Sequence, residues 1–380
     1  MQQINKTTKL TLLLIAMMTV MSNVAIITTL PHLKNYFTEF DNIDLLARLM
    51  LTLPSLSIAL LAPFLGHIIQ KIGRKKATLY TLTFFSIFGS AGLFLDSIHM
   101  LLFSRALLGI AIATLMIVST SLVGDYFQGE ARHKFMGLQS AFNSIGGLLF
   151  VIGGGILSDY SWRFPFAIYL VGFVLIPFIV KFLDEKTKVV TIRDEGEVNS
   201  NLFGIYVLAF FFMMIFYILP TQMPFLIINE FGASGAFTGS IIAVSFLLNA
   251  FGALFFARLK RVFSFGQIYL IGLSIMSLGF IGNGLINDVN FFFVTAAIFG
   301  FGGGLMMANI SIWMLQVAHH TKRIKSSGYL TSSLFFGQFF SPILLHPIVS
   351  VYGVQDFFTI IGVFLVVIVV AIVVWRKIKI

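Results

Sequence analysis

The sequence predicts an all-α membrane protein in which twelve transmembrane helices form two six-helix bundles. Its 380 residues are 58% hydrophobic and only 11% charged, with a mean hydropathy of +0.97, unlike the composition of a soluble domain. Apolar runs recur at the ~20 residues that a helix needs to cross a hydrocarbon core of about 30 Å. One long polar stretch, residues 184–200, lies near the middle of the chain. It separates six apolar runs from six more.

Hydropathy, glycine and proline positions, and charge clusters predict where each helix lies. The first six helices are expected at residues 9–32, 46–69, 77–95, 99–123, 135–158 and 163–183. The last six are expected at residues 201–225, 237–258, 266–286, 290–316, 327–350 and 356–376. The first apolar run is longer than the ~7–15-residue core of a signal peptide, and no small-residue cleavage site follows it, so we interpret it as a retained helix.

The distribution of Lys and Arg predicts the orientation. With the amino terminus inside, 21 of the 25 Lys and Arg residues are cytoplasmic; Lys34, Arg48 and Arg163 lie outside, and Arg105 lies within a helix. Short loops rich in these residues resist translocation. We therefore expect a multi-pass protein of the cell (inner) membrane with both termini cytoplasmic. The net charge of +10 then reflects this asymmetry, and no nucleic-acid partner is expected.

Internal repetition predicts the domain organisation. We expect an N-terminal bundle at 1–183, a cytoplasmic linker at 184–200 and a C-terminal bundle at 201–380, although 184–200 could also be an ordinary large loop. A shift of 186 residues aligns the pattern at 66–75 with 252–261, and a shift of about 190 aligns 115–132 with 305–322. Two related six-helix halves are typical of alternating-access transporters, whose substrate site lies near mid-membrane between the halves.

The cationic turn between the second and third predicted helices carries a family resemblance. Residues 66–75 read GHIIQKIGRK, which resembles the Gly-x-Leu-Ala-Asp-Arg-x-Gly-Arg-Lys signature of the major facilitator superfamily. Gly66, Gly73, Arg74 and Lys75 match the signature, and Gln70 replaces its acidic residue. In such transporters the acid is thought to hold the inner gate shut, so the replacement argues against a charge-based latch here, although Gln70 retains neutral hydrogen-bonding capacity.

A second resemblance lies in the fourth predicted helix, where Leu102-x-x-Arg105-x-x-x-Gly109-x-x-x-Ala113 is similar to the superfamily pattern with an intramembrane arginine. Arg105 would lie roughly 8 Å from the outer end of its helix. It could attract an anionic group of a substrate, reach the outer headgroups, or pair with helix carbonyls in a structural role. Further superfamily-like landmarks are Gly124-Asp125-Tyr126-Phe127 and Trp162-Arg163-x-Pro165-Phe166.

The fifth predicted helix is similar to that of proton-coupled drug antiporters, whose signature is Gly-x-x-x-Gly-Pro-x-x-Gly-Gly. Gly146, Gly153 and Gly154 are present, but Phe150-Val151 replaces the Gly-Pro pair. The glycines therefore indicate either this gating motif or close packing of two helices.

Uncharged polar residues supply most of the candidate substrate contacts. They lie on helices that line the cavity in this superfamily, although each could instead hydrogen-bond helix to helix. The set is Asn23, Asn143, Gln222, Asn249, Asn309 and Gln338. No carboxylate lies mid-membrane, so the coupling candidates are Arg105, His346 and acids at outer helix ends such as Asp44. His346 is flanked by Pro342 and Pro347, which we expect to interrupt the helix.

The sequence carries no enzymatic constellation: HExxH, GxxxxGK[ST] and GxSxG are all missing, and there is no cysteine. We expect no cofactor, no metal and no catalytic residue. The hypothesis is a monomeric secondary transporter that exports a small amphipathic or anionic compound in exchange for protons. The missing mid-membrane carboxylate and Gly-Pro pair favour an alternative, uptake or facilitated diffusion of a nutrient or organic anion. A non-transporting membrane sensor or assembly factor is the third hypothesis.

Overall fold

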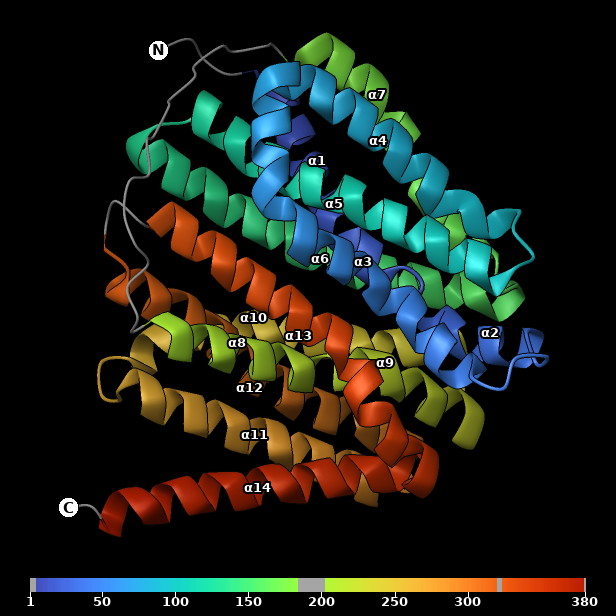
Figure 1. The fold of residues 1–380 in the computed structure, drawn as a ribbon, viewed down its shortest axis with the longest axis vertical. Helices are drawn as coiled ribbons and strands as arrows, with labels where there is room; N and C mark the ends of the chain where they lie inside the picture. Colours follow the sequence, from blue (N-terminus) through green and yellow to red (C-terminus); the bar gives the residue numbers. More distant parts are fainter. Residues whose placement is uncertain (1–4, 184–201, 320–322, 379–380) are drawn as a thin grey trace. The chain divides into compact units, whose positions relative to one another are not determined.

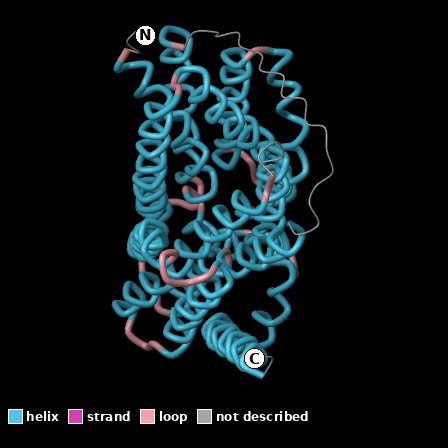
Figure 2. Tube along the Cα trace, turned by 90° about the vertical axis from the view of Figure 1, so that its left-hand side faces the viewer, coloured by secondary structure: helices cyan, strands magenta, loops and turns pink. Residues whose placement is uncertain are grey.

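The computed structural model describes residues 5–183, 202–319 and 323–378. These residues form helices joined by short turns, and none of them lies in a strand (Figures 1 and 2). The chain divides into two compact units, residues 1–195 and residues 196–380. The division falls in the predicted linker, whose residues lie outside the described part of the chain.

The N-terminal unit begins with a span that is not one continuous helix. After Val24 the chain forms a short 3-10 turn and then a further helix, so the expected helix at 9–32 consists of α1, η1 and α2. The elements are α1 (Lys6–Val24), η1 (Ile27–Thr29), α2 (Leu30–Tyr36), α3 (Ile43–Ile72), α4 (Arg74–Ser90), η2 (Ala91–Leu93), α5 (Ile98–Tyr126), α6 (Gly129–Tyr160), η3 (Phe164–Leu170) and α7 (Val171–Phe182).

The C-terminal unit also begins with an interrupted span. α8 ends at Phe216, α9 follows directly, and the span finishes as a π-helix, η5. The elements are α8 (Phe203–Phe216), α9 (Ile218–Pro224), η5 (Phe225–Glu230), α10 (Gly235–Leu259), α11 (Phe265–Leu285), η6 (Val289–Phe291), α12 (Phe292–Val317), α13 (Arg323–Tyr352) and α14 (Val354–Ile378).

The helix count exceeds the expected twelve because two predicted helices are interrupted. Among the described residues there are fourteen α-helices, and α2 and α9 are the additional pieces. Ten segments of the described chain are long and apolar enough to cross a membrane. The structure therefore supports a multi-pass, all-helical membrane fold.

Glycines let helices pack backbone to backbone in both units, and one such pair occurs at equivalent places in the two. In the C-terminal unit, Cβ atoms on Gly252, Gly300 and Gly304 would collide with backbone atoms across the contact between α10 and α12. In the N-terminal unit, α3 and α5 form the corresponding pair, where a Cβ on Gly109 would lie 2.8 Å from the Cα of Pro54. Small residues allow such close approach between membrane helices. The two contacts join equivalent helices of the predicted repeat.

Helix α13 continues through Pro342 and Pro347, so the expectation that these residues interrupt the helix is wrong. A proline removes one N–H donor from the helical ladder and disfavours the preceding turn. Membrane helices tolerate this because packing against neighbours and small local adjustments satisfy the freed backbone groups.

Candidate functional site

The cationic turn is built on a single glycine that both ends α3 and begins α4. Gly73 has φ of 91°, a conformation that favours glycine because it has no Cβ. Its N–H donates to the carbonyl of Ile69 at 3.0 Å and closes the last turn of α3. Gly66, by contrast, has open space where a Cβ would stand. The first of these two signature glycines is thus not needed for packing within the unit, whereas the second shapes the turn.

Two basic residues of the turn bind other helices of the same unit. The guanidinium of Arg74 forms an ion pair with Asp125, near the end of α5, and Lys75 Nζ donates to the carbonyl of Val180 in α7 at 2.9 Å. The Asp125 side chain is only 9% exposed. Gln70 is exposed on α3. The acid that meets the turn therefore comes from α5, at a position the sequence singled out as a landmark without pairing it with Arg74.

Arg105 lies fully buried within the N-terminal unit. Its Nη2 donates to the carbonyls of Phe88 and Gly89 at 2.9 and 2.6 Å, which are among the last carbonyls of α4. The guanidinium also stacks on the rings of Phe166 and Tyr169, with 5.0 and 5.1 Å between Cζ and the ring centroids. A cation satisfies carbonyls at a helix C-terminus and complements the helix dipole. These contacts match the structural role that the sequence left open for Arg105.

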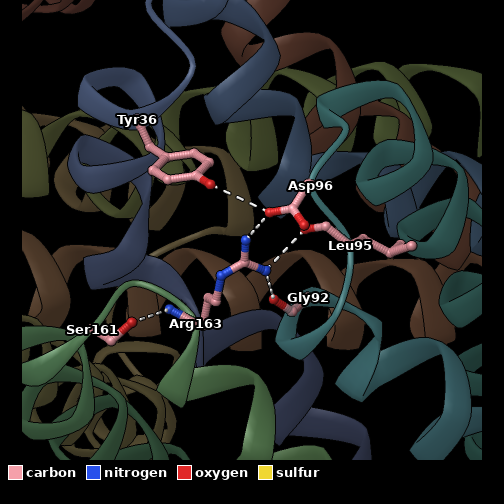
Figure 3. A network of polar contacts seen from close by, with 6 residues as sticks. All are labelled: Tyr36, Gly92, Leu95, Asp96, Ser161 and Arg163. Atoms are coloured by element: carbon pink, nitrogen blue, oxygen red, sulfur yellow. Dashed lines mark hydrogen bonds and ion pairs between the residues drawn. The ribbon is translucent and has the colours of Figure 1, made fainter.

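Arg163 organises a polar network at another end of the N-terminal unit (Figure 3). Its Nη1 donates to the carbonyls of Gly92 and Leu95 at 3.3 and 3.0 Å, and Nη2 pairs with Asp96. The hydroxyl of Tyr36 donates to the same carboxylate at 3.3 Å. The network joins α2, η2 and the start of η3.

Arg48, expected on the outer side of the membrane near the start of the helix predicted at 46–69, lies in α3, where it is 1% exposed. Its Nη1 donates to the Asp44 carbonyl at 2.8 Å and to the Asp44 carboxylate at 3.3 Å. Asp44 also pairs with Lys34 at 3.0 Å. Asp44 thus lies between two cations, which makes it a poorer proton carrier than a carboxylate without a partner.

The glycines of α6 differ in what they face. A Cβ on Gly146 would collide with Met17 of α1, and one on Gly154 would collide with the backbone of Ala25, just after α1. A Cβ on Gly153 would have nothing within 4 Å. Gly146 and Gly154 therefore allow α6 to pack closely against α1 and the residue that follows it, whereas Gly153 takes no part in this packing.

The C-terminal unit brings polar and aromatic side chains together near the midpoints of its helices. The side chain of Gln338 on α13 faces the hydroxyl of Tyr217, which lies between α8 and α9. Gly303 of α12 leaves room for two more side chains. A Cβ added at this position would lie 2.6 Å from the Phe216 ring and 3.2 Å from the Asn249 amide nitrogen. We name Phe216, Tyr217, Asn249 and Gln338 the C-terminal polar layer.

Tyr217 was missed by the sequence analysis, although two signals could have found it. It is a tyrosine inside an apolar run, and a buried tyrosine hydroxyl usually requires a polar partner. The run also contains Pro220 and Pro224 and ends in a π-helix, and irregular helices often mark functional sites in membrane transporters.

Four other predicted residues lie apart from these contacts. Gln222 is buried in α9, His346 is half-buried in α13, and Asn143 is half-buried in α6. The amide oxygen of Asn143 has no hydrogen-bond partner among the described residues. Asn23 lies in α1, but its side chain is outside the part of the chain that the structure describes.

Asn309 has a structural contact. It is buried in α12, and its Nδ2 donates to the carbonyl of Phe265, the first residue of α11, at 3.0 Å. This bond ties two helices of the C-terminal unit together, as buried asparagines commonly do in membranes.

The chain belongs to the Major Facilitator Superfamily, whose family model matches residues 12–226 and 202–379. It is 24% identical over 315 residues to an uncharacterized MFS-type transporter, YybF, of Bacillus subtilis, covering 79% of this chain and 77% of the relative. It is 27% identical over 310 residues to multidrug resistance protein 1 of Bacillus subtilis, covering 75% and 76% of the two chains. The protein is therefore a membrane transporter that resembles the drug efflux branch of the superfamily.

Solved structures share the fold. One similar structure is the crystal structure of a bacterial homologue of the human lysosomal transporter Spinster, in an inward-facing and unoccupied conformation. It aligns with a TM-score of 0.81 at 16% identity and covers 95% of this chain and 94% of that one.

Proposed function

We propose that the protein exports a small amphipathic compound in exchange for protons, by alternating access between two six-helix bundles. The C-terminal polar layer carries this proposal. Amides and a hydroxyl beside aromatic rings suit a ligand with an apolar body and few polar groups. The likeness to a protein named for multidrug resistance supports export over the other directions.

We further propose that the chain crosses the membrane twelve times. Ten spans are long and apolar by themselves. The remaining two would be the first span, formed by α1, η1 and α2, and the shorter helix α4. The asymmetry of Lys and Arg supports cytoplasmic termini in the cell membrane, and we retain a monomer as the working state.

The contacts of Arg105 favour an amphipathic over an anionic substrate. Its guanidinium already meets two carbonyls and two aromatic rings of its own unit. Because Arg105 is fully buried in that unit, a substrate anion would have to open the packing around it. The site we propose in the C-terminal unit therefore consists of the C-terminal polar layer with Gln222, while Asn143 and Asn23 are separate candidate substrate contacts of the N-terminal unit.

Variants of the layer test the site. Tyr217→Phe and Gln338→Leu should each weaken substrate binding because each removes a buried polar group available to a ligand, a loss of about tenfold at ~1.4 kcal/mol. Tyr329→Phe removes an exposed hydroxyl of the same unit and serves as the matched control. Export from loaded cells, measured as apparent affinity and maximal rate, provides the readout. Unchanged affinity in both layer variants would contradict this site.

Collapse of the proton gradient tests the coupling. Export should stop in energised cells when a protonophore is added, while counterflow of substrate in de-energised vesicles should continue. Export that persists without a gradient would contradict proton exchange. The substrate itself can be found by comparing drug tolerance and metabolite content between deletion and overexpression strains.

A second candidate function is uptake or facilitated diffusion of a nutrient. It is favoured by one observation: all described carboxylates lie at helix ends or in turns, and none lies at the middle of a span. Proton-driven transport ordinarily uses a titratable group inside the membrane. Accumulation of a defined solute by proteoliposomes would select this candidate.

A further inference from the structure

An apolar groove of about 460 Å³ lies on the C-terminal unit, along α8, α11 and α14. α11 and α14 lie side by side in Figure 1. Phe211 and Phe364 line the groove and are 46% and 58% exposed, so the groove opens at the surface of the unit. Tyr269 also lines it, but its hydroxyl donates to the Leu208 carbonyl at 3.1 Å. The groove therefore presents hydrocarbon almost throughout.

The length of the groove matches one leaflet of a bilayer. Along α14 it runs from Ile361 to Ile372, which is about 16 Å at 1.5 Å per residue. Half of a hydrocarbon core of about 30 Å is ~15 Å. A single acyl chain lying parallel to the helices would fill it from the surface of the leaflet to the bilayer midplane.

A second hollow of about 620 Å³ adjoins the first and lies at the beginning of α8 and the end of α12. Leu208 and Trp313 line both. Two apolar hollows that meet at one tryptophan suit a ligand with two hydrocarbon chains. A tryptophan at this level is also typical of the interface between hydrocarbon and headgroups.

Three basic residues near the turn between α10 and α11, Arg258, Lys260 and Arg261, lie at the same end of the groove. The Phe265 ring stacks on Trp313 with 5.6 Å between centroids, and Lys260 Nζ lies 4.3 Å from the centroid of Phe265. Arg258 and Arg261 flank Lys260, and the sequence has no acid between Glu230 and Asp288. The hydrogen bond from Asn309 holds the Phe265 backbone in place. Positive charge therefore borders the hydrocarbon groove where a lipid headgroup would lie.

We propose that this groove binds one anionic glycerophospholipid, with its acyl chains on either side of Trp313 and its phosphate near Lys260 and Arg261. Two apolar hollows and a cationic rim match the two parts of such a lipid, whereas a neutral lipid would gain nothing from the rim. The proposal depends on the protein's membrane location and not on the direction or coupling of transport.

Quenching of Trp313 by brominated lipids tests the proposal. Trp162→Phe and Trp375→Phe leave Trp313 as the sole tryptophan. In bilayers of phosphatidylcholine, a small fraction of brominated phosphatidylglycerol should quench Trp313 more strongly than the same fraction of brominated phosphatidylcholine. Neutralising one cation beside an anionic lipid should lower the apparent affinity about fivefold. Equal quenching by the two lipids would overturn the proposal.

Two sets of variants test separately the contribution of the basic residues Lys260 and Arg261 and that of the apolar hollows. Lys260→Gln with Arg261→Gln should abolish the preference for the anionic lipid, whereas Arg323→Gln with Lys325→Gln, on α13, should preserve it. Leu270→Phe with Ile368→Phe should fill the groove and reduce quenching, whereas Leu278→Phe, on an exposed face of α11 outside the groove, should not. If the filled variant does not fold, the charge variants decide. Preference that survives loss of both cations would also overturn the proposal.

Discussion

Arg74 and Asp125 form an ion pair that joins the start of α4 to the end of α5. Each charge has the unfavourable sign for its own helix end, since a cation stands at an N-terminus and an anion near a C-terminus. Each residue therefore depends on the other for compensation. The turn is therefore paired with an acid from α5, although this chain has Gln70 where the superfamily signature has its acid.

This dependence predicts a non-additive double-mutant cycle. Arg74→Gln or Asp125→Asn alone should each destabilise the protein by about 2 kcal/mol, because each leaves a partly buried charge without its partner. The double variant should be closer to the wild type than either single variant. Thermal unfolding in detergent measures this, with Lys134→Gln, whose exposed ion pair with Glu130 contributes little, as the control. Additive effects would contradict the dependence.

Restoring the signature acid should change the conformational balance. In Gln70→Asp the new carboxylate should compete for the cations of the turn, strengthen the closed cytoplasmic side and slow opening to the inside. The chain has no cysteine, so single cysteines placed in the cytoplasmic half can report access to a thiol reagent. Gln70→Ala controls for loss of the amide. Unchanged transport and labelling in Gln70→Asp would remove this inference.

Arg105 is predicted to act through stability. Arg105→Ala should lower the free energy of unfolding by about 3 kcal/mol, because the carbonyls of Phe88 and Gly89 lose a charged donor. Arg105→Lys should recover part of this loss. A substrate-binding role instead predicts normal thermal stability with reduced binding, so the two measurements together distinguish the roles.

Neighbouring glycines of α6 provide a matched pair. Gly154→Ala should destabilise the protein by about 2 kcal/mol because its Cβ meets the backbone of Ala25, which has little room to move. Gly153→Ala meets open space and should be neutral or slightly stabilising, since alanine favours a helix over glycine. Unfolding temperatures of the two variants, compared in one detergent, provide the test. If both variants were equally stable, α6 and α1 would be less closely packed than the structure indicates.

The sequence predicted regular helices well and their interruptions poorly. The helix expected at 266–286 is α11, Phe265–Leu285, because apolar length and flanking polar residues determine such a segment locally. The break at Tyr217 has a local signal in Pro220, but α13 continues through Pro342 and Pro347, so a proline alone does not determine where a membrane helix breaks. Likewise, Asp125 was visible as a residue, but its contact with Arg74 arises only when α4 and α5 lie together.

The candidate site was predicted in part for the same reason. Asn249 and Gln338 were selected as polar residues on suitable helices, and the structure brings both to the level of Tyr217 in the C-terminal unit. Asn309 passed the same sequence test but bonds to the backbone of α11. The sequence identifies polar side chains, but the role of each depends on which groups lie within hydrogen-bonding distance in the folded protein.

The continuous course of α13 through Pro342 interrupts the hydrogen bonding of the helix at Gln338. The carbonyl of Gln338 would ordinarily accept a hydrogen bond from the N–H of residue 342, and proline has none. The helix therefore lacks one regular main-chain hydrogen bond at Gln338, the residue whose side chain faces Tyr217. Replacing Pro342 with alanine would supply the missing N–H and should stiffen α13 next to the C-terminal polar layer.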